Sequence, residues 1–295
     1  MFFIATRIKT VTVSLISLLL ISCSLLEESS TSNISNFNIQ DSNGRAIVFD
    51  NHPNKMIVYD AAAIEILLAM GEGDRIIGTH QFVQLPANSP SITRVGDAFN
   101  VNYEKIVDLN PDLFFVFYET FTADLENLGI KVLYLNSLDT DLEDIRAHIK
   151  IWGIVTGNIQ AANNLVDTFD NQLNHISDQL PNSLTKPVVY YHTFDYWTPG
   201  GDTLIGSIFE LVNTNMVSQG LSGYTQISLE ELVSKNPDFI FTDKWGFDQI
   251  TSENALQSIK AIKNNQVYVL KNGSLSVASH NILLTIEELT NLIYK

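Results

Sequence analysis

Short apolar runs alternate with amphipathic stretches along most of the chain. In the first half, the apolar runs predict strands at 55–59, 75–79, 113–117 and 131–135, and the amphipathic stretches predict helices at 61–70, 102–109 and 122–128. In the second half, the predicted strands are 187–192, 238–242 and 266–270, and the predicted helices are 203–212, 228–233 and 280–294. Strands that alternate with helices form βαβ units with parallel strands. The pattern therefore predicts an α/β protein with two Rossmann-like lobes, each with a central parallel sheet.

A repeated segment supports two similar lobes. Residues 102–116 read NYEKIVDLNPDLFFV and residues 228–242 read SLEELVSKNPDFIFT, in a register that places Glu104 on Glu230. In each copy an amphipathic helix stops at Asn-Pro-Asp. A continuous apolar run follows, which is typical of a strand buried on both faces of a parallel sheet. A chance recurrence of a common helix–strand junction is the alternative interpretation.

Between the two halves, residues 142–180 have a helical pattern that only Gly153 and Gly157 interrupt. We expect one long backbone helix within 139–180, joining an N-terminal lobe at 45–138 to a C-terminal lobe at 181–295. Such a helix is a stiff connection, so only a small closure of the lobes is expected when a ligand binds.

The N-terminus has the pattern of an export signal. Arg7 and Lys9 precede the apolar run 11–21, which is shorter than the roughly 20 residues that a membrane-spanning helix needs. The run ends in Leu-Ile-Ser-Cys at Cys23, which resembles the bacterial lipobox, whose cysteine becomes the lipid-modified first residue. We expect a lipoprotein signal peptide at 1–22, lipidation of Cys23 and a Ser- and Asn-rich flexible tether at 23–44. An ordinary signal peptide with a chance cysteine is the alternative.

Charge and cysteine content exclude several classes of function. Acidic residues outnumber basic ones 33 to 17, for a net charge of −16. This balance argues against a nucleic-acid partner and against attachment to an anionic membrane through basic patches. A single cysteine excludes a disulfide framework and zinc or iron–sulfur sites built on cysteines. The sequence has no G-x-S-x-G elbow and no Walker-type loop, so we expect no catalytic site and no enzyme activity.

Aromatic residues gather where the predicted strands end, which is where open α/β sheets bind ligands. These candidates are His80, Phe82, Phe117, Tyr118, Trp197, Trp245 and Phe247, accompanied by Phe121, Phe194, Tyr196 and Lys244. The set predicts a cleft for a large, flat or apolar ligand; the alternative is that these residues cap the two cores. The histidines lack local metal-ligand spacing. A zinc or manganese site on His80, His192 and His280 stays open as an alternative.

Several short motifs recur in the order of a known family. They are helix 61–70 with the turn 71–78, Gly96 before Asn-Tyr-Glu at 102–104, Asn-Pro-Asp-Leu at 110–113, Gly153 with Gly157, Ser-Leu-Glu at 228–230, and Ile-Lys-Asn-Asn-Gln-Val-Tyr at 262–268. Over roughly residues 45–295 the chain resembles class III periplasmic solute-binding proteins, which serve ABC importers of vitamin B12, iron–siderophore complexes and heme. The resemblance implies an extracytoplasmic monomer that hands its ligand to a permease dimer with its ATPase.

The resemblance also assigns roles to individual residues. It implies that Glu104 and Glu230 dock onto arginines of the permease, the alternative being that they are only helix N-terminal charges. It adds Phe99 and Tyr224 to the ligand-binding candidates. The aromatic walls have only Lys244 as a clearly placed cation, and His280 stands near a position where many relatives have arginine. A corrinoid or a hydroxamate siderophore is therefore favoured over a catecholate complex.

Two alternatives to a corrinoid or siderophore remain. Heme would take an axial ligand from Tyr118, His80 or His280. An extracellular enzyme or adhesion module built on the same fold is the alternative from a different class of function.

Overall fold

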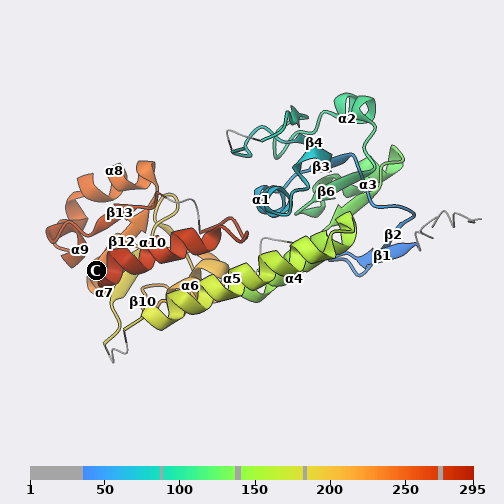
Figure 1. Ribbon diagram of the computed structural model, residues 1–295. Coiled ribbons are helices and arrows are strands. Elements are labelled where there is room, and N and C mark those ends of the chain that lie inside the picture. Colours follow the sequence, from blue (N-terminus) through green and yellow to red (C-terminus); the bar gives the residue numbers. More distant parts are fainter. Residues whose placement is uncertain (1–35, 87–88, 137–140, 182–184, 272–274) are drawn as a thin grey trace, which may run out of the picture. The chain divides into compact units, whose positions relative to one another are not determined.

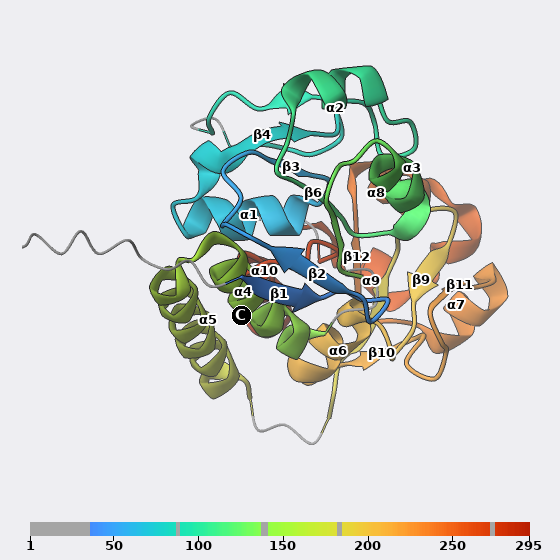
Figure 2. The same cartoon turned by 90° about the vertical axis from the view of Figure 1, so that its right-hand side faces the viewer.

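The first lobe is built on a parallel sheet in a computed structural model that describes residues 36–86, 89–136, 141–181, 185–271 and 275–295 (Figures 1 and 2). The predicted signal peptide, Cys23 and the first part of the predicted tether lie outside the described residues. The strand order is β5-β4-β3-β6-β7, and all neighbours run parallel. The strands are β3 (Met56–Val58), β4 (Ile76–Thr79), β5 (Thr93–Arg94), β6 (Leu113–Val116) and β7 (Val132–Tyr134).

Alternate strand residues of this sheet enter two different hydrophobic clusters, because successive side chains of a strand point to opposite faces. Phe115 packs in the cluster that contains helix α1 (Ala61–Ala69). Phe114 packs in the cluster with α2 (Tyr103–Leu109) and α3 (Thr122–Asn127). Figure 2 shows α1 and α2 on opposite faces of β3, β4 and β6. Short 3-10 turns, η1 (Gly73–Arg75) and η2 (Glu119–Phe121), precede β4 and α3.

The second lobe repeats this layered plan. Its parallel sheet has the order β10-β8-β12-β13, with β8 (Val188–Tyr191), β10 (Asn215–Met216), β12 (Phe239–Thr242) and β13 (Val267–Val269). Phe241 packs toward α6 (Leu204–Leu211) and α10 (Ile282–Tyr294). Ile240 packs toward α7 (Leu229–Lys235), α8 (Lys244–Ser252), η3 (Asn254–Leu256) and α9 (Lys260–Lys263). The two predicted α/β lobes with parallel sheets are confirmed.

The sequence repeat is a repeat of structure. The carboxylate of Asp112 accepts hydrogen bonds from the backbone N–H groups of Asn54 and Lys55, at the start of β3. The carboxylate of Asp238 accepts a hydrogen bond from the N–H of Val188, the first residue of β8. In each lobe, the aspartate of Asn-Pro-Asp therefore fixes the start of the neighbouring central strand.

The single helix expected over 142–180 is wrong, although the segment is helical. It forms two helices, α4 (Leu142–Thr156) and α5 (Ile159–Gln179), with Gly157 in the left-handed conformation between them. The helices run side by side (Figures 1 and 2), and Arg146 of α4 forms an ion pair with Asp170 of α5. A Cβ on Gly153 would lie 2.5 Å from the Cβ of Ala162, so this glycine permits the close packing. The chain reverses because Gly157 caps one helix and Asn158 begins the next.

The tether expected at 23–44 is wrong for residues 36–44. Strand β1 (Phe37–Gln40) pairs antiparallel with β2 (Ala46–Phe49) through a turn that contains Gly44 at φ 75°. The Phe37 ring stacks on Phe49 and on His52. The apolar side chains of this hairpin have a place to pack, so the segment is part of the fold.

One hydrophobic cluster runs through both lobes. It contains Phe115 of the first sheet, Trp152 of α4, Phe169 of α5 and Phe241 of the second sheet. The carboxylate of Glu65 in α1 also accepts hydrogen bonds from the Ser279 hydroxyl and the Asn281 amide, just before α10. The lobes are thus joined through packed side chains as well as through the chain. Within the described residues, no helix combines the length and the apolar character needed to cross a membrane.

Candidate functional site

Each sheet has a position where the strand order reverses, and such positions bind ligands in open α/β sheets. In the first lobe it lies between β3 and β6, and in the second between β8 and β12. Phe117 and Tyr118 follow β6, and His192 follows β8. Phe117, Tyr118 and His192 therefore lie where the topology favours a ligand site.

The first lobe presents two strongly exposed phenylalanines beside these strand ends. Phe82 is 56% exposed and Phe99 is 79% exposed. The carboxylate of Asp97 accepts hydrogen bonds from the backbone N–H groups of Phe99 and Asn100, each at 2.7 Å. These hydrogen bonds lower the pKa of Asp97. The aspartate thus remains charged and fixes the turn that carries Phe99.

His80 is buried beneath this surface. Its ring packs edge-on against Tyr59, and its Nδ1 accepts a hydrogen bond from the N–H of Phe82 at 3.2 Å. Burial, together with the charge of Arg94, lowers the pKa of the imidazole. Tyr118 lies nearby with its ring against Phe117 and Phe121. Among the described residues, the buried hydroxyl of Tyr118 has no hydrogen-bond partner.

In the second lobe, a small two-stranded antiparallel sheet carries two more of the predicted residues. Trp197 begins β9 (Trp197–Pro199) and Tyr224 begins β11 (Tyr224–Gln226), and the two strands pair antiparallel. Their exposed fractions are 41% and 47%. The carboxylate of Asp202 accepts hydrogen bonds from the hydroxyl of Ser222 and the N–H of Gly223, which lowers its pKa and fixes the turn before Tyr224.

Trp245 and Phe247 lie in the first turn of α8, where the sequence suggested a loop. The side chain of Asp243 caps this helix by accepting a hydrogen bond from the N–H of Gly246 at 2.7 Å. Trp245 is 83% exposed, and Lys244 beside it is also exposed. A side chain at the start of a capped helix has a fixed direction, so Trp245 is presented to solvent on a rigid base.

The loop 193–196 between β8 and β9 is strained. Asp195 and Tyr196 both have positive φ values, 44° and 60°, although neither is glycine. Each such residue costs roughly 1–2 kcal/mol in this region. The loop exposes Phe194 at 77%, and the buried ring of His192 lies at its base. The sequence pointed to Phe194 and Tyr196 but gave no sign of the strain.

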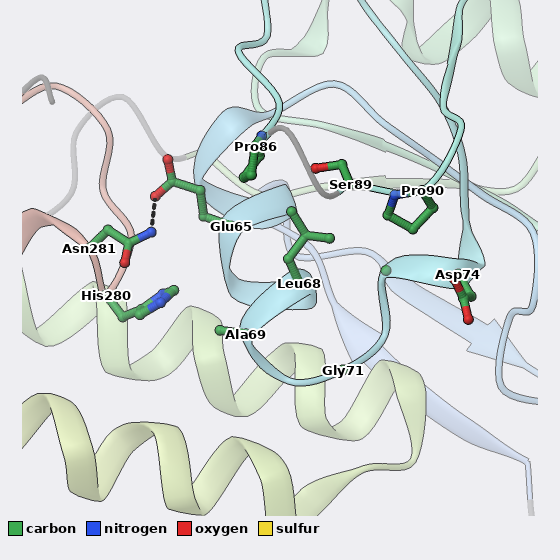
Figure 3. A pocket seen from close by; sticks show the side chains of 11 residues that line it. Glu65, Leu68, Ala69, Gly71, Asp74, Pro86, Ser89, Pro90, His280 and Asn281 are labelled. Atoms are coloured by element: carbon green, nitrogen blue, oxygen red, sulfur yellow. Dashed lines mark hydrogen bonds between the residues drawn. The ribbon is translucent and has the colours of Figure 1, made fainter.

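His280 lines a pocket of about 440 Å³ (Figure 3). Glu65, Leu68, Asp74 and Ser89 also line this pocket, and none of the predicted aromatic residues does. Within the described residues, the buried atoms His280 Nδ1 and Ser89 Oγ have no hydrogen-bond partner. Burial lowers the pKa of His280. Of the predicted ligand-binding residues, His280 thus lines this pocket together with residues of α1.

The histidine metal site weighed from the sequence gains no support. His80 belongs to the first lobe, His192 is 1% exposed beneath α8, and His280 lines the pocket beside α1. Over the described ranges, no three His, Cys, Asp or Glu side chains gather as a metal-binding group.

Glu104 and Glu230 occupy equivalent places in the two lobes. Each lies in the first turn of its helix, α2 or α7, and each is exposed. The helices are capped alike, by Asn102 accepting from the N–H of Lys105 and by Ser228 accepting from the N–H of Glu231. The exposed Val107 follows Glu104 by one helical turn. Two matched carboxylates are therefore available to a partner.

The chain matches a known protein family and is similar to several known proteins. Residues 56–273 match the family described as periplasmic binding protein. The chain is 28% identical over 211 residues to a cobalamin-binding protein of Halobacterium salinarum, covering 68% of this chain and 57% of the relative. It thus spans little more than half the length of that relative. It is 24% identical over 269 residues to the uncharacterized ABC transporter substrate-binding lipoprotein YvrC of Bacillus subtilis, covering 87% of this chain and 85% of the relative.

A solved structure agrees with the fold. The molybdate-bound periplasmic binding protein MolA of Haemophilus influenzae superimposes with a TM-score of 0.76, covering 88% of this chain and 91% of MolA. The two sequences are 20% identical. At this identity the likeness concerns the arrangement of the two lobes and carries no information about the ligand.

Proposed function

Because the chain belongs to the periplasmic binding protein family, we propose that it is the substrate-binding lipoprotein of an ABC importer and that its ligand is a corrinoid. The family resemblance found in the sequence is confirmed by the match over residues 56–273. The observation that carries the choice of ligand is the set of exposed aromatic side chains in both lobes. They are Phe82, Phe99, Phe194, Trp197, Tyr224 and Trp245.

Exposed aromatic rings suit a large ligand with extended apolar faces. An aromatic side chain contributes a large contact area and loses little conformational entropy on binding. Here the turns are held before the ligand arrives, by Asp97 under Phe99, by Asp202 before Tyr224 and by Asp243 under α8. Such preorganisation lowers the entropic cost of binding.

Charge narrows the ligand further. The carboxylates that hold these turns give the aromatic surface an excess of negative charge. The guanidinium of Arg94 is already engaged, because it donates a hydrogen bond to the carbonyl of His80. A ligand with several negative charges would need arginines or lysines to replace its hydration. A neutral or cationic chelate fits better, and a corrinoid or a hydroxamate siderophore has that character. The relative named as cobalamin-binding favours the corrinoid.

An extracytoplasmic location and a lipid anchor at Cys23 complete the proposal. The support for the anchor is the lipobox-like sequence that ends at Cys23 and the similarity to a relative named as a lipoprotein. Glu104 and Glu230 then serve as the contacts to the permease. Two equivalent anions on two similar lobes suit a permease with two-fold symmetry.

The transport role is tested with Glu104→Arg and Glu230→Arg combined. In cells that depend on this protein, uptake of labelled cyanocobalamin is expected to fall at least about tenfold, because like charges at an interface cost several kcal/mol. Binding of cyanocobalamin by the purified variant is expected to stay unchanged. The matched control combines Asp167→Arg and Asp178→Arg, which change the same charge on the exposed face of α5. Equal uptake by both double variants would refute the docking role.

A further inference from the structure

We infer that His192 is a positioning residue: its neutral imidazole holds the loop 193–197 and the start of α8 together, and protonation of the ring releases the loop. The loop carries Phe194 and leads into Trp197, the first residue of β9, and α8 carries Trp245 and Phe247. His192 is thus the buried link between the two aromatic elements of the second lobe. The link to ligand binding rests on the proposed function, whereas the link to loop conformation stands on the structure alone.

Both ring nitrogens of His192 are engaged. Nε2 accepts a hydrogen bond from the backbone N–H of Tyr196 at 3.2 Å. The ring proton must therefore sit on Nδ1, which donates to the Thr242 hydroxyl oxygen at 3.0 Å. A protonated ring carries a hydrogen on Nε2 as well, and two N–H groups cannot share one hydrogen bond. The arrangement thus fits only the neutral form.

The bond that protonation would break stabilises a strained residue. Tyr196 has φ 60°, and Asp195 before it has φ 44°. Backbone strain of this kind persists only where surrounding contacts enforce it. Here the contacts include the hydrogen bond from Tyr196 N–H to His192 and the one from Ile227 N–H to the Tyr196 carbonyl. The Gln226 side chain also donates to the Asp195 carbonyl, and Thr193 N–H donates to the Trp197 carbonyl. Two of these hydrogen bonds act at Tyr196 itself, and the one to His192 is the one that a proton on the ring would break.

The start of α8 presses directly on the same ring. A Cβ added to Gly246 would lie 2.4 Å from Nδ1 of His192 and 2.0 Å from the hydroxyl oxygen of Thr242. Glycine therefore lets the helix that carries Trp245 approach the imidazole without a gap. His192 is 1% exposed as a result. A change at the ring is transmitted to α8 because no space separates the two.

The surroundings set the balance for protonation. Asp243 of the α8 cap and Asp195 of the loop favour the charged form of the ring, and so does a hydrogen bond with the side chain of Gln249 in α8. The rings of Tyr190 and Tyr196 pack edge-on against it. Burial outweighs these charges and lowers the pKa of His192. The ring is thus neutral at neutral pH and takes up a proton only at a pH below the usual range of histidine.

The test uses Trp197 as a reporter in a Trp245→Phe background, where the remaining tryptophan, Trp152, is buried. Because burial lowers the pKa of His192, emission is followed from about pH 7.5 down through the usual histidine range and below it, to about pH 4.5. With His192 present, a one-proton transition in Trp197 emission is expected. His192→Gln keeps an acceptor near the position of Nε2 without titrating, so the transition should vanish. His192→Phe removes the acceptor and should show the released signal at every pH.

Two controls keep the result specific. His175→Gln changes an exposed histidine on α5 and should leave the transition intact. Circular dichroism and melting curves establish that each variant is folded. A transition that persists in His192→Gln, or a Trp197 signal in His192→Phe equal to that of the parent at about pH 7.5, would overturn the inference.

A second measurement connects the loop to binding in the protein with both tryptophans. Its affinity for cyanocobalamin should weaken with acidification, approaching about tenfold per pH unit below the pKa of the ring, because binding then expels one proton. In His192→Gln the affinity should stay flat. Equal pH dependence in both proteins would refute the effect on binding. Failure of cyanocobalamin to bind at about pH 7.5 would refute the proposed ligand, and the emission experiment would still decide the role of His192.

Discussion

Asn110 and Asn236 end equivalent helices in the two lobes with the same left-handed backbone, at φ 47° and 48°. Their side chains make different contacts: Asn236 Oδ1 accepts a hydrogen bond from the backbone N–H of Lys260 at 2.9 Å. Glycine suits this conformation. We therefore expect Asn110→Gly to change the free energy of unfolding by less than about 0.5 kcal/mol. Asn236→Gly also loses the hydrogen bond and should cost about 1 kcal/mol. Urea denaturation of the two variants measures the difference, and equal effects would contradict it.

The packing of α8 on His192 makes Gly246 sensitive to substitution. Gly246→Ala forces a methyl group against Thr242 and His192, and such overpacking costs about 1–3 kcal/mol. Gly220→Ala is the matched control, because its Cβ would meet nothing within 4 Å. Thermal melting should therefore show a clear loss for Gly246→Ala and almost none for Gly220→Ala. Similar melting temperatures would show that α8 can shift away from His192 at little cost.

The buried histidines predict loss of stability in mild acid. Burial lowers the pKa of His80, His148 and His192 in the folded protein. The folded state therefore binds fewer protons than the unfolded chain, whose histidines titrate near pH 6.5. The free energy of unfolding should fall as the pH drops from about 6.5 through the lower folded values, before most carboxylates titrate. Denaturant midpoints at about pH 7.5, 6 and 5 test this, and midpoints that rise or stay constant would contradict it.

The exposed tryptophans should contribute to binding and little to stability. Trp245→Ala removes a side chain that is 83% exposed, so the melting temperature should barely change. If the ring contacts the ligand, its loss costs about 0.5–1.5 kcal/mol beyond the buried area. This part alone corresponds to roughly 2- to 12-fold weaker binding of cyanocobalamin, and the lost buried area weakens binding further. Ile159→Ala, which truncates a residue that is 56% exposed at the start of α5, is the control and should bind like the parent.

Much of the fold could be predicted from local patterns in the sequence. Continuous apolar runs such as 113–116 and 239–242 became central strands, because a strand buried on both faces needs apolar residues at every position. The hairpin of β1 and β2 was missed because Phe37 and Ile39 alternate with polar residues inside a Ser- and Asn-rich segment. The reversal at Gly157 was missed because a glycine within a helical pattern fits either a continuous helix or a break. The packing of Gly153 on Ala162 decides between them.

Some features of the candidate site could be predicted from the sequence, and others could not. The aromatic residues could be found because strand ends in α/β proteins mark ligand sites. The groups that hold them could not, since Asp202 and Ser222, or His192 and Thr242, meet only in the folded chain. His280 was assigned with the aromatic residues, and the structure places it in the pocket beside Glu65. The sequence around His280 does not indicate that α1 packs beside it.

The most direct test of the central claim is a titration of the mature domain, followed by tryptophan fluorescence and corrected for ligand absorbance. The panel is cyanocobalamin, a ferric hydroxamate, a ferric catecholate and hemin. We predict saturable binding of cyanocobalamin with a dissociation constant below about 1 µM, or about −8 kcal/mol. The trianionic catecholate should not bind. Tight binding of the catecholate or hemin without cyanocobalamin, or no binding of any of the four, would contradict the account.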